Sequence, residues 1–151
     1  MGEAFHGAAG ITLDAKGRLA LPTRHREALT AAGAPELVLT AQPDGCLLLY
    51  PMAAWDPVRS KVEKFPALNP QMAVWKRLLI GFEEHLAPDA SGRILISPAL
   101  RLHAKLEREL MMLGQGGYFE LWDHGLWTAK LTQAQANAGS TPPPGMEDFS
   151  L

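Results

Sequence analysis

Two arginines are the residues of this chain best placed to do chemistry, because each ends the same short motif. The first motif is Asp14-Ala15-Lys16-Gly17-Arg18, and the second is Asp89-Ala90-Ser91-Gly92-Arg93, 75 residues later. Beyond the motifs, two further pairs match at the same offset, Leu21 with Ile96 and Arg26 with Arg101. A gapless match that keeps charged and glycine positions is a repeat. It indicates that both arginines serve one purpose, which is to present a positive charge to a partner.

The Asp-x-x-Gly part of each motif predicts a tight turn. An aspartate at the first position of a type I turn, here Asp14 or Asp89, accepts backbone N–H bonds from residues further along, and glycine suits the fourth position. Gly17 and Gly92 can adopt a positive φ there and form the bulge with which a hairpin turns back. The arginine then begins an outgoing strand at the rim of a sheet. One copy alone is typical of an ordinary hairpin with a surface arginine, but two copies in one register favour a binding role.

Composition is that of an ordinary folded protein of one domain or two small ones. The chain has 151 residues, of which 47% are apolar and 20% charged, and no apolar run approaches the roughly 20 residues that span a bilayer. No secretory signal is visible, and Cys46 has no disulfide partner, which fits a buried thiol in a reducing cytosol. The net charge of −2 does not indicate a nucleic-acid binder, but positive charge is concentrated locally. Between Asp14 and Arg26, four Lys and Arg residues accompany one acidic residue.

The first half predicts a strand, a turn, a strand, a helix and a hairpin. Short strands are expected at 11–13 and 19–21, followed by a helix at 24–32 that Thr23 caps. Apolar runs at 37–40 and 46–50, joined by a Pro-Asp-Gly turn, predict a hairpin. Apolar residues at helical spacing then predict two helices, one over 55–65 with Pro57 near its first turn and one capped by Asn69.

The second half repeats this order. It predicts a strand at 82–87, a strand at 94–96, a helix capped by Ser97, a hairpin of 110–113 and 118–122, and a helix that starts at Leu126. The chain therefore divides into a first repeat at 5–51, a helical linker at 52–80, a second repeat at 81–124, a closing helix at 125–137 and a tail at 138–151. The proline-rich tail is expected to be disordered, and residues 1–10 to be mobile except where Phe5 docks on the fold.

Together these features resemble the MraZ family of bacterial transcriptional regulators, which consist of two fused AbrB-like modules. The segments that carry the resemblance are 13–22, 44–51, 89–95 and 119–123. The match runs from about Phe5 to Leu131 and departs from the family at Ser97, where the family usually has proline, and in the extended start at residues 1–4. The resemblance implies an α+β fold with tandem AbrB-like swapped-hairpin halves. Related by a pseudo-twofold axis, these would form a single β-barrel, with short helices between and after them.

The resemblance also implies sequence-specific binding to double-stranded DNA. The protein would regulate the division and cell-wall gene cluster that contains its own gene, binding promoter direct repeats as a ring-shaped homo-oligomer in the cytoplasm, associated with the nucleoid. Arg18 and, by symmetry, Arg93 would contact bases, since arginine can donate two hydrogen bonds to guanine. Lys16 and Ser91 would contact phosphates, while the two aspartates would shape the turns because phosphate repels a carboxylate.

Three other functions are weighed against this one. An enzyme is disfavoured, because the five histidines are scattered and no His, Cys and Asp set has the spacing of a metal site. His25 and His103 are expected at the surface or at helix ends, and no cofactor, metal, membrane or small-molecule substrate is expected. An antitoxin is a second alternative, since AbrB-like modules occur there too. A protein-binding structural ring is the third, with the arginines as ordinary surface charges.

Overall fold

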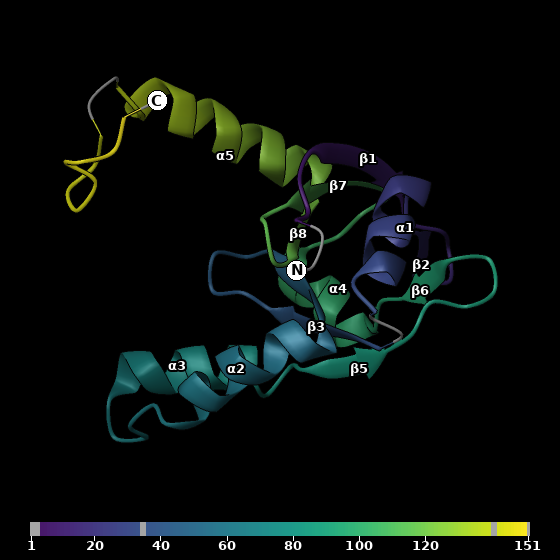
Figure 1. Cartoon of the computed structure of the whole chain (residues 1–151), viewed down its shortest axis with the longest axis horizontal. Helices are drawn as coiled ribbons and strands as arrows, with labels where there is room; N and C mark the ends of the chain where they lie inside the picture. The colour runs from purple at the N-terminus through teal and green to yellow at the C-terminus, as the bar shows by residue number, and fades with distance from the viewer. Residues whose placement is uncertain (1–3, 34–35, 140–141, 151) are drawn as a thin grey trace.

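The computed structural model describes residues 4–33, 36–139 and 142–150, and Figure 1 shows its ribbon. It is an α+β fold in which the strands pair antiparallel. Its elements in chain order are β1 (Ala8–Thr12), β2 (Arg18–Ala20), α1 (Thr23–Ala31), β3 (Leu37–Ala41), β4 (Leu47–Pro51), α2 (Met52–Glu63), α3 (Pro70–Leu79), β5 (Glu84–Leu86), β6 (Arg93–Leu95), α4 (Pro98–Ala104), β7 (Glu109–Gly114), β8 (Phe119–Asp123) and α5 (His124–Asn137).

The two halves of the chain exchange strands. Within the described residues, one sheet has the order β1-β7-β8-β4-β3-β5, and β2 and β6 form a separate pair. The hairpins β3–β4 and β7–β8 meet at the centre of the large sheet through β4 and β8. β1 then pairs with β7 of the other half, and β5 pairs with β3. This is the swapped-hairpin arrangement expected of tandem AbrB-like halves.

The strands on either side of each motif do not form the local hairpin that the turn chemistry predicts. β2 pairs with β6 instead, and only one isolated bridge, between Leu13 and Leu19, joins the two sides of the first motif. Leu19 and Ile94 face each other across the β2–β6 pair, and each is 2% exposed. The exchange is favourable because it buries both side chains in one shared core, which a lone three-residue hairpin cannot do.

The large sheet has a hydrophobic core on each face, since successive strand residues point to opposite sides. One face, which includes Leu39 and Leu49, packs against the β2–β6 pair and helices α1 and α4. The other face packs against α2, whose Trp55 is fully buried. The indole Nε1 of Trp55 donates to Glu83 Oε1 at 2.6 Å, which fastens the α2–α3 linker to the start of the second half. None of the helices in the described part of the chain could cross a membrane.

Several helix boundaries differ from the sequence-based predictions. Helix α1 begins at Thr23 itself, after Pro22, so the predicted Thr23 cap is wrong and no side chain caps this helix. Helix α2 begins at Met52, earlier than expected, so Pro57 lies inside the helix. The caps Asn69 and Ser97 are confirmed, because each side chain accepts a backbone N–H of the first turn that follows it.

The two ends of the chain also differ from expectation. Residues 8–10, predicted to be mobile, belong to β1 and pair with β7. Phe5 does dock, and its ring stacks on Phe119 with centroids 4.5 Å apart. Helix α5 begins at His124, two residues before the predicted Leu126, because Asp123 caps it. Residues 142–150 contain no helix or strand, and residues 1–3, 140–141 and 151 of the predicted mobile ends lie outside the described residues.

Candidate nucleic-acid interface

The first turn, Asp14–Arg18, is closed by one carboxylate. Asp14 Oδ1 accepts the backbone N–H groups of Lys16 and Arg18, both at 2.9 Å. Asp14 Oδ2 accepts from the Arg18 side chain, with Nε at 3.1 Å. Gly17 completes the turn at φ +83°, a conformation that glycine adopts without a steric penalty. The N–H of Arg18 is the main cause that lowers the pKa of Asp14 below its ordinary value, so the carboxylate stays charged.

The second turn, Asp89–Arg93, has the same geometry. Asp89 Oδ1 accepts the N–H groups of Ser91 at 2.8 Å and Arg93 at 2.9 Å, and Oδ2 lies 3.2 Å from Arg93 Nε. Gly92 has φ +75°. The N–H of Arg93 likewise lowers the pKa of Asp89. The repeat in the sequence is therefore a repeat in the arrangement of hydrogen bonds.

Each aspartate contacts its arginine through Nε. Across residues 4–33, 36–139 and 142–150, no hydrogen bond engages the terminal amino groups of Arg18 or Arg93. Those two groups form the fork that can donate in parallel to a guanine edge or a phosphate. Lys16 and Ser91 are exposed at the matching third position of the two turns. Each turn thus offers a fixed guanidinium with an exposed polar side chain beside it.

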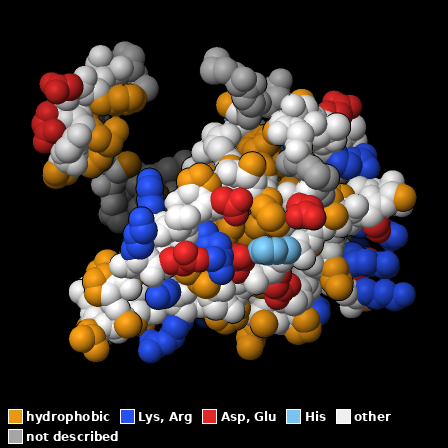
Figure 2. Space-filling view, turned by 60° about the horizontal axis from the view of Figure 1, so that its bottom comes forward, with side chains coloured by type: hydrophobic (Ala, Val, Ile, Leu, Met, Phe, Trp, Pro, Cys, Tyr) orange, Lys and Arg blue, Asp and Glu red, His pale blue; other side chains and the backbone are white. Residues whose placement is uncertain are grey.

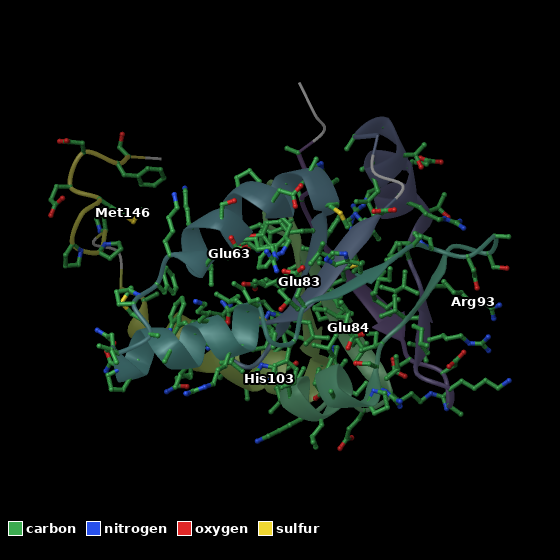
Figure 3. All side chains as sticks on the ribbon, turned by 90° about the horizontal axis from the view of Figure 1, so that it is seen from below. Glu63, Glu83, Glu84, Arg93, His103 and Met146 are labelled. Atoms are coloured by element: carbon green, nitrogen blue, oxygen red, sulfur yellow. The ribbon has the colours of Figure 1, made fainter. Side chains whose placement is uncertain are left out.

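The β2–β6 pair brings the two turns onto one surface. Arg18 lies opposite Leu95, and Ala20 lies opposite Arg93. Cross-strand partners share a face, and residues two apart share a face, so these four side chains lie on the same outer side, while Leu19 and Ile94 point inward. Figure 2 shows Lys and Arg side chains gathered at this end of the molecule, and Figure 3 shows Arg93 at the end away from the α2–α3 pair. The two arginines therefore lie on one surface, with Leu95 opposite Arg18 and Ala20 opposite Arg93.

The turns are also joined to each other. The N–H of Leu21 donates to the carbonyl of Gly92 at 2.9 Å, and the N–H of Ile96 donates to the carbonyl of Gly17 at 2.8 Å. Arg26 of α1 donates to the carbonyl of Ser91, at 3.1 Å, in the second turn. Sequence reasoning found Arg26 only as a member of the repeat, and did not find that it crosses to the other half. In the sequence, only the matched offset of Arg26 and Arg101 could have indicated that these two arginines have a role at the turns.

The other polar groups that sequence analysis considered do not form a competing site. His25 lies in the first turn of α1, which agrees with a helix-end position, but it is 2% exposed with its ring edge-to-face against Phe119, so the surface alternative is wrong. Burial lowers the pKa of His25, because the core disfavours the charged imidazole. Cys46 is fully buried, as expected, and burial raises its pKa. Among the described residues, no three His, Cys, Asp or Glu side chains come together in a way that could hold a metal ion.

Comparisons with known proteins identify the family. The model described as "MraZ protein, putative antitoxin-like" matches the chain twice, at residues 4–78 and 79–146. Proteins named transcriptional regulator MraZ from Aromatoleum aromaticum and Methylobacillus flagellatus are each 46% identical over 147 residues. One from Dechloromonas aromatica is 47% identical over the same length, and each alignment covers 97% of this chain and 99% of the relative. Two adjoining family matches and relatives of this similarity over the full length show that the chain belongs to the MraZ family.

Proposed function

We propose that this protein is a sequence-specific, DNA-binding transcriptional regulator whose two turns contact the DNA. The observation that carries the proposal is the outer face of the β2–β6 pair, where two aspartates hold Arg18 and Arg93 in equivalent geometry. A two-stranded β-ribbon fits into the major groove, which is about 12 Å wide. The relatives named transcriptional regulators, which match the chain along its length, support the same function.

Within this proposal, Arg18 and Arg93 contact bases. Their terminal amino groups can donate two hydrogen bonds to O6 and N7 of guanine, the commonest specific contact of arginine. Lys16 and Ser91 contact phosphates on either side and set the register of the protein on the duplex. The aspartates do not touch the DNA, because their oxygens are already engaged by the turn and phosphate repels them. DNA binding by these residues needs no cofactor and involves no catalysis, so the proposed protein is not an enzyme.

The protein acts as a ring-shaped homo-oligomer on direct repeats in the promoter of the division and cell-wall cluster that contains its own gene. A chain of net charge −2 attracts DNA weakly through one pair of turns. Several subunits on spaced repeats gain avidity without any new type of contact. The two modules of each subunit are residues 5–51 and 81–124, joined by the linker 52–80 and followed by the closing helix 125–137 and the tail 138–151. The protein is cytoplasmic and associates with the nucleoid.

Binding to the DNA upstream of the protein's own gene tests the function. We would compare the wild type with Arg18→Ala, Arg93→Ala and the control Arg77→Ala, at physiological salt because phosphate contacts depend on salt. Arg77 is an exposed arginine on α3, remote from the turns. Each turn variant should lose affinity for the specific site by about 1–3 kcal/mol, roughly fivefold to a hundredfold, and bind scrambled DNA as before. Arg77→Ala should bind like the wild type.

Equal binding of all four proteins to specific and scrambled DNA would refute the base-contacting role. No binding at all would favour the alternatives, an antitoxin-type AbrB-like protein or a protein-binding ring. The antitoxin alternative has one observation on its side, the antitoxin-like description of the matching family model. The oligomeric state of each variant must be measured in parallel, because loss of the ring would lower affinity without any change in base contacts.

A further inference from the structure

Two arginines outside the motifs cross from one half of the chain to the turn of the other half. Arg26 lies on α1 of the first half and contacts the second turn, while Arg101 lies on α4 of the second half and contacts the first turn. They occupy matched positions of the repeat, 75 residues apart. Each crosses because the swapped pairing of β2 with β6 brings every turn beside the helix of the opposite half.

Arg26 holds the second turn by a hydrogen bond and by shape. Its Nη1 donates to the carbonyl of Ser91 at 3.1 Å, and its Nη2 lies 3.4 Å from Thr23 Oγ1. The side chain passes close over Gly92, so a methyl group there would be 2.5 Å from Arg26 Cδ and 2.7 Å from Cζ. Arg26 thus fixes the peptide group between Ser91 and Gly92 from outside the turn. Gly92 directly precedes Arg93. Glycine is required at this position by the arginine as well as by the backbone.

Arg101 reaches the first turn less directly, through Ile96 of its own half and by contact with Gly17. Its Nε donates to the carbonyl of Ile96 at 3.1 Å, and the N–H of Ile96 donates to the carbonyl of Gly17 at 2.8 Å. A methyl group at Gly17 would lie 2.9 Å from Arg101 Cζ and 3.0 Å from Nε. The guanidinium therefore covers the open side of Gly17. Since Gly17 precedes Arg18, the contact restricts the start of β2.

We propose that Arg26 and Arg101 are positioning residues that act across the pseudo-twofold axis, with Arg26 orienting Arg93 and Arg101 orienting Arg18. The inference rests on the proposed function for its effect on DNA, but the contacts themselves are independent of DNA. Its distinctive consequence is that each helix arginine is coupled to the turn of the opposite half and not to the turn of its own half. Removing Arg26 impairs the second turn, 65 residues away in sequence, and leaves the first turn of its own half intact.

Double-mutant cycles of DNA affinity test the crossed pattern. Arg26→Ala and Arg101→Ala are each combined with Arg18→Ala and with Arg93→Ala, and all proteins are checked for an intact oligomer. Loss of one hydrogen bond should weaken binding about twofold to tenfold in each single variant. The pairs Arg26 with Arg93 and Arg101 with Arg18 should be less than additive, because an arginine that is absent cannot be misplaced. The pairs Arg26 with Arg18 and Arg101 with Arg93 should be additive.

Two readouts separate positioning from direct contact. An arginine that binds phosphate contributes about one ion to the salt dependence, so its removal lowers the slope of log K against log salt by about 0.9, whereas removal of a positioning residue leaves the slope unchanged. Amide hydrogen exchange in the free protein gives the second readout. Arg26→Ala should speed exchange at the amides of 91–93 and not at those of 16–18. The control Arg24→Ala, an exposed arginine on the same helix beside Gly7, should leave exchange at both sets of amides unchanged.

Three results would each overturn the proposal. They are additive effects in the pairs Arg26 with Arg93 and Arg101 with Arg18, a lower salt slope on removal of Arg26 or Arg101, and unchanged exchange at 91–93 in Arg26→Ala. A lower slope would assign Arg26 or Arg101 to the phosphates instead. If the wild type shows no specific DNA binding, the proposed function fails, yet hydrogen exchange still decides whether the two arginines hold the turns. The two failures are therefore distinguishable.

Discussion

Substitution of Gly92 by alanine is the sharpest test of how the second turn is built. Gly92 has φ +75°, where an L-residue costs about 1–2 kcal/mol more than glycine. The new methyl group would also lie 2.5 Å from Arg26 Cδ, so the arginine must move and give up its hydrogen bond to Ser91. That bond contributes about 1 kcal/mol. We expect Gly92→Ala to lower the free energy of unfolding by about 2–3 kcal/mol in total.

Gly116→Ala is the matched control. Gly116 has φ +85°, and nothing lies within 4 Å of the position where its methyl group would be. It should therefore incur only the backbone cost, about 1–2 kcal/mol. The assay is denaturant unfolding at one fixed protein concentration, because the stability of an oligomer depends on concentration. The double variant with Arg26→Ala completes the design, since removing the arginine should reduce the effect of Gly92→Ala to that of Gly116→Ala.

Equal destabilisation by Gly92→Ala and Gly116→Ala would refute this reasoning, because it would mean that Arg26 does not press on the glycine. Full additivity of Gly92→Ala with Arg26→Ala would refute it independently. In either case the second turn would depend on its own hydrogen bonds alone. The crossed role of Arg26 would then lose its structural basis.

Three further predictions concern pH, a surface leucine and the buried thiol. The pKa values of Asp14 and Asp89 are lower in the folded protein than in the unfolded chain, so the stability they add is present above about pH 4 and is lost as the pH falls through the folded values; NMR of the turn amides should follow this loss, and a turn unchanged under acid would contradict it. Leu95→Glu places a carboxylate directly opposite Arg18, on the face proposed to contact DNA, so DNA affinity should fall. The control Leu68→Glu, at an exposed site between α2 and α3, should have no effect, and equal effects of the two variants would count against a DNA-facing β2–β6 pair. Cys46 should resist a thiol-specific reagent in the native protein and react only on unfolding, because it is fully buried with a raised pKa; rapid native labelling would show that the chain opens just before strand β4.

Short-range features of this protein could be predicted from the sequence. The Asp-x-x-Gly pattern closes each turn with bonds between residues no more than four apart, and such bonds form wherever the chain has that local sequence. The caps at Asn69 and Ser97 were predictable for the same reason. The repeat itself was visible as matched residue types at a constant offset. This repeat was sufficient to indicate the family and the fold class.

Long-range features could not be predicted in this way. A strand of three residues, such as β2, carries too little pattern to specify its partner, and local reasoning assigned it to the wrong hairpin. His25 looked like a surface residue on a short helix, but the docking of Phe5 and Phe119 around it decided that it is buried.

The sequence by itself thus determined the two turns and the arginines that they present, because these depend on neighbours along the chain. Only the tertiary structure decided that the turns share one surface and that each is held by an arginine of the other half. Arg26 and Ser91 are 65 residues apart, and no local interaction can bring them together. Their contact follows from the burial of Leu19 against Ile94, which pairs β2 with β6 and is a property of the folded core.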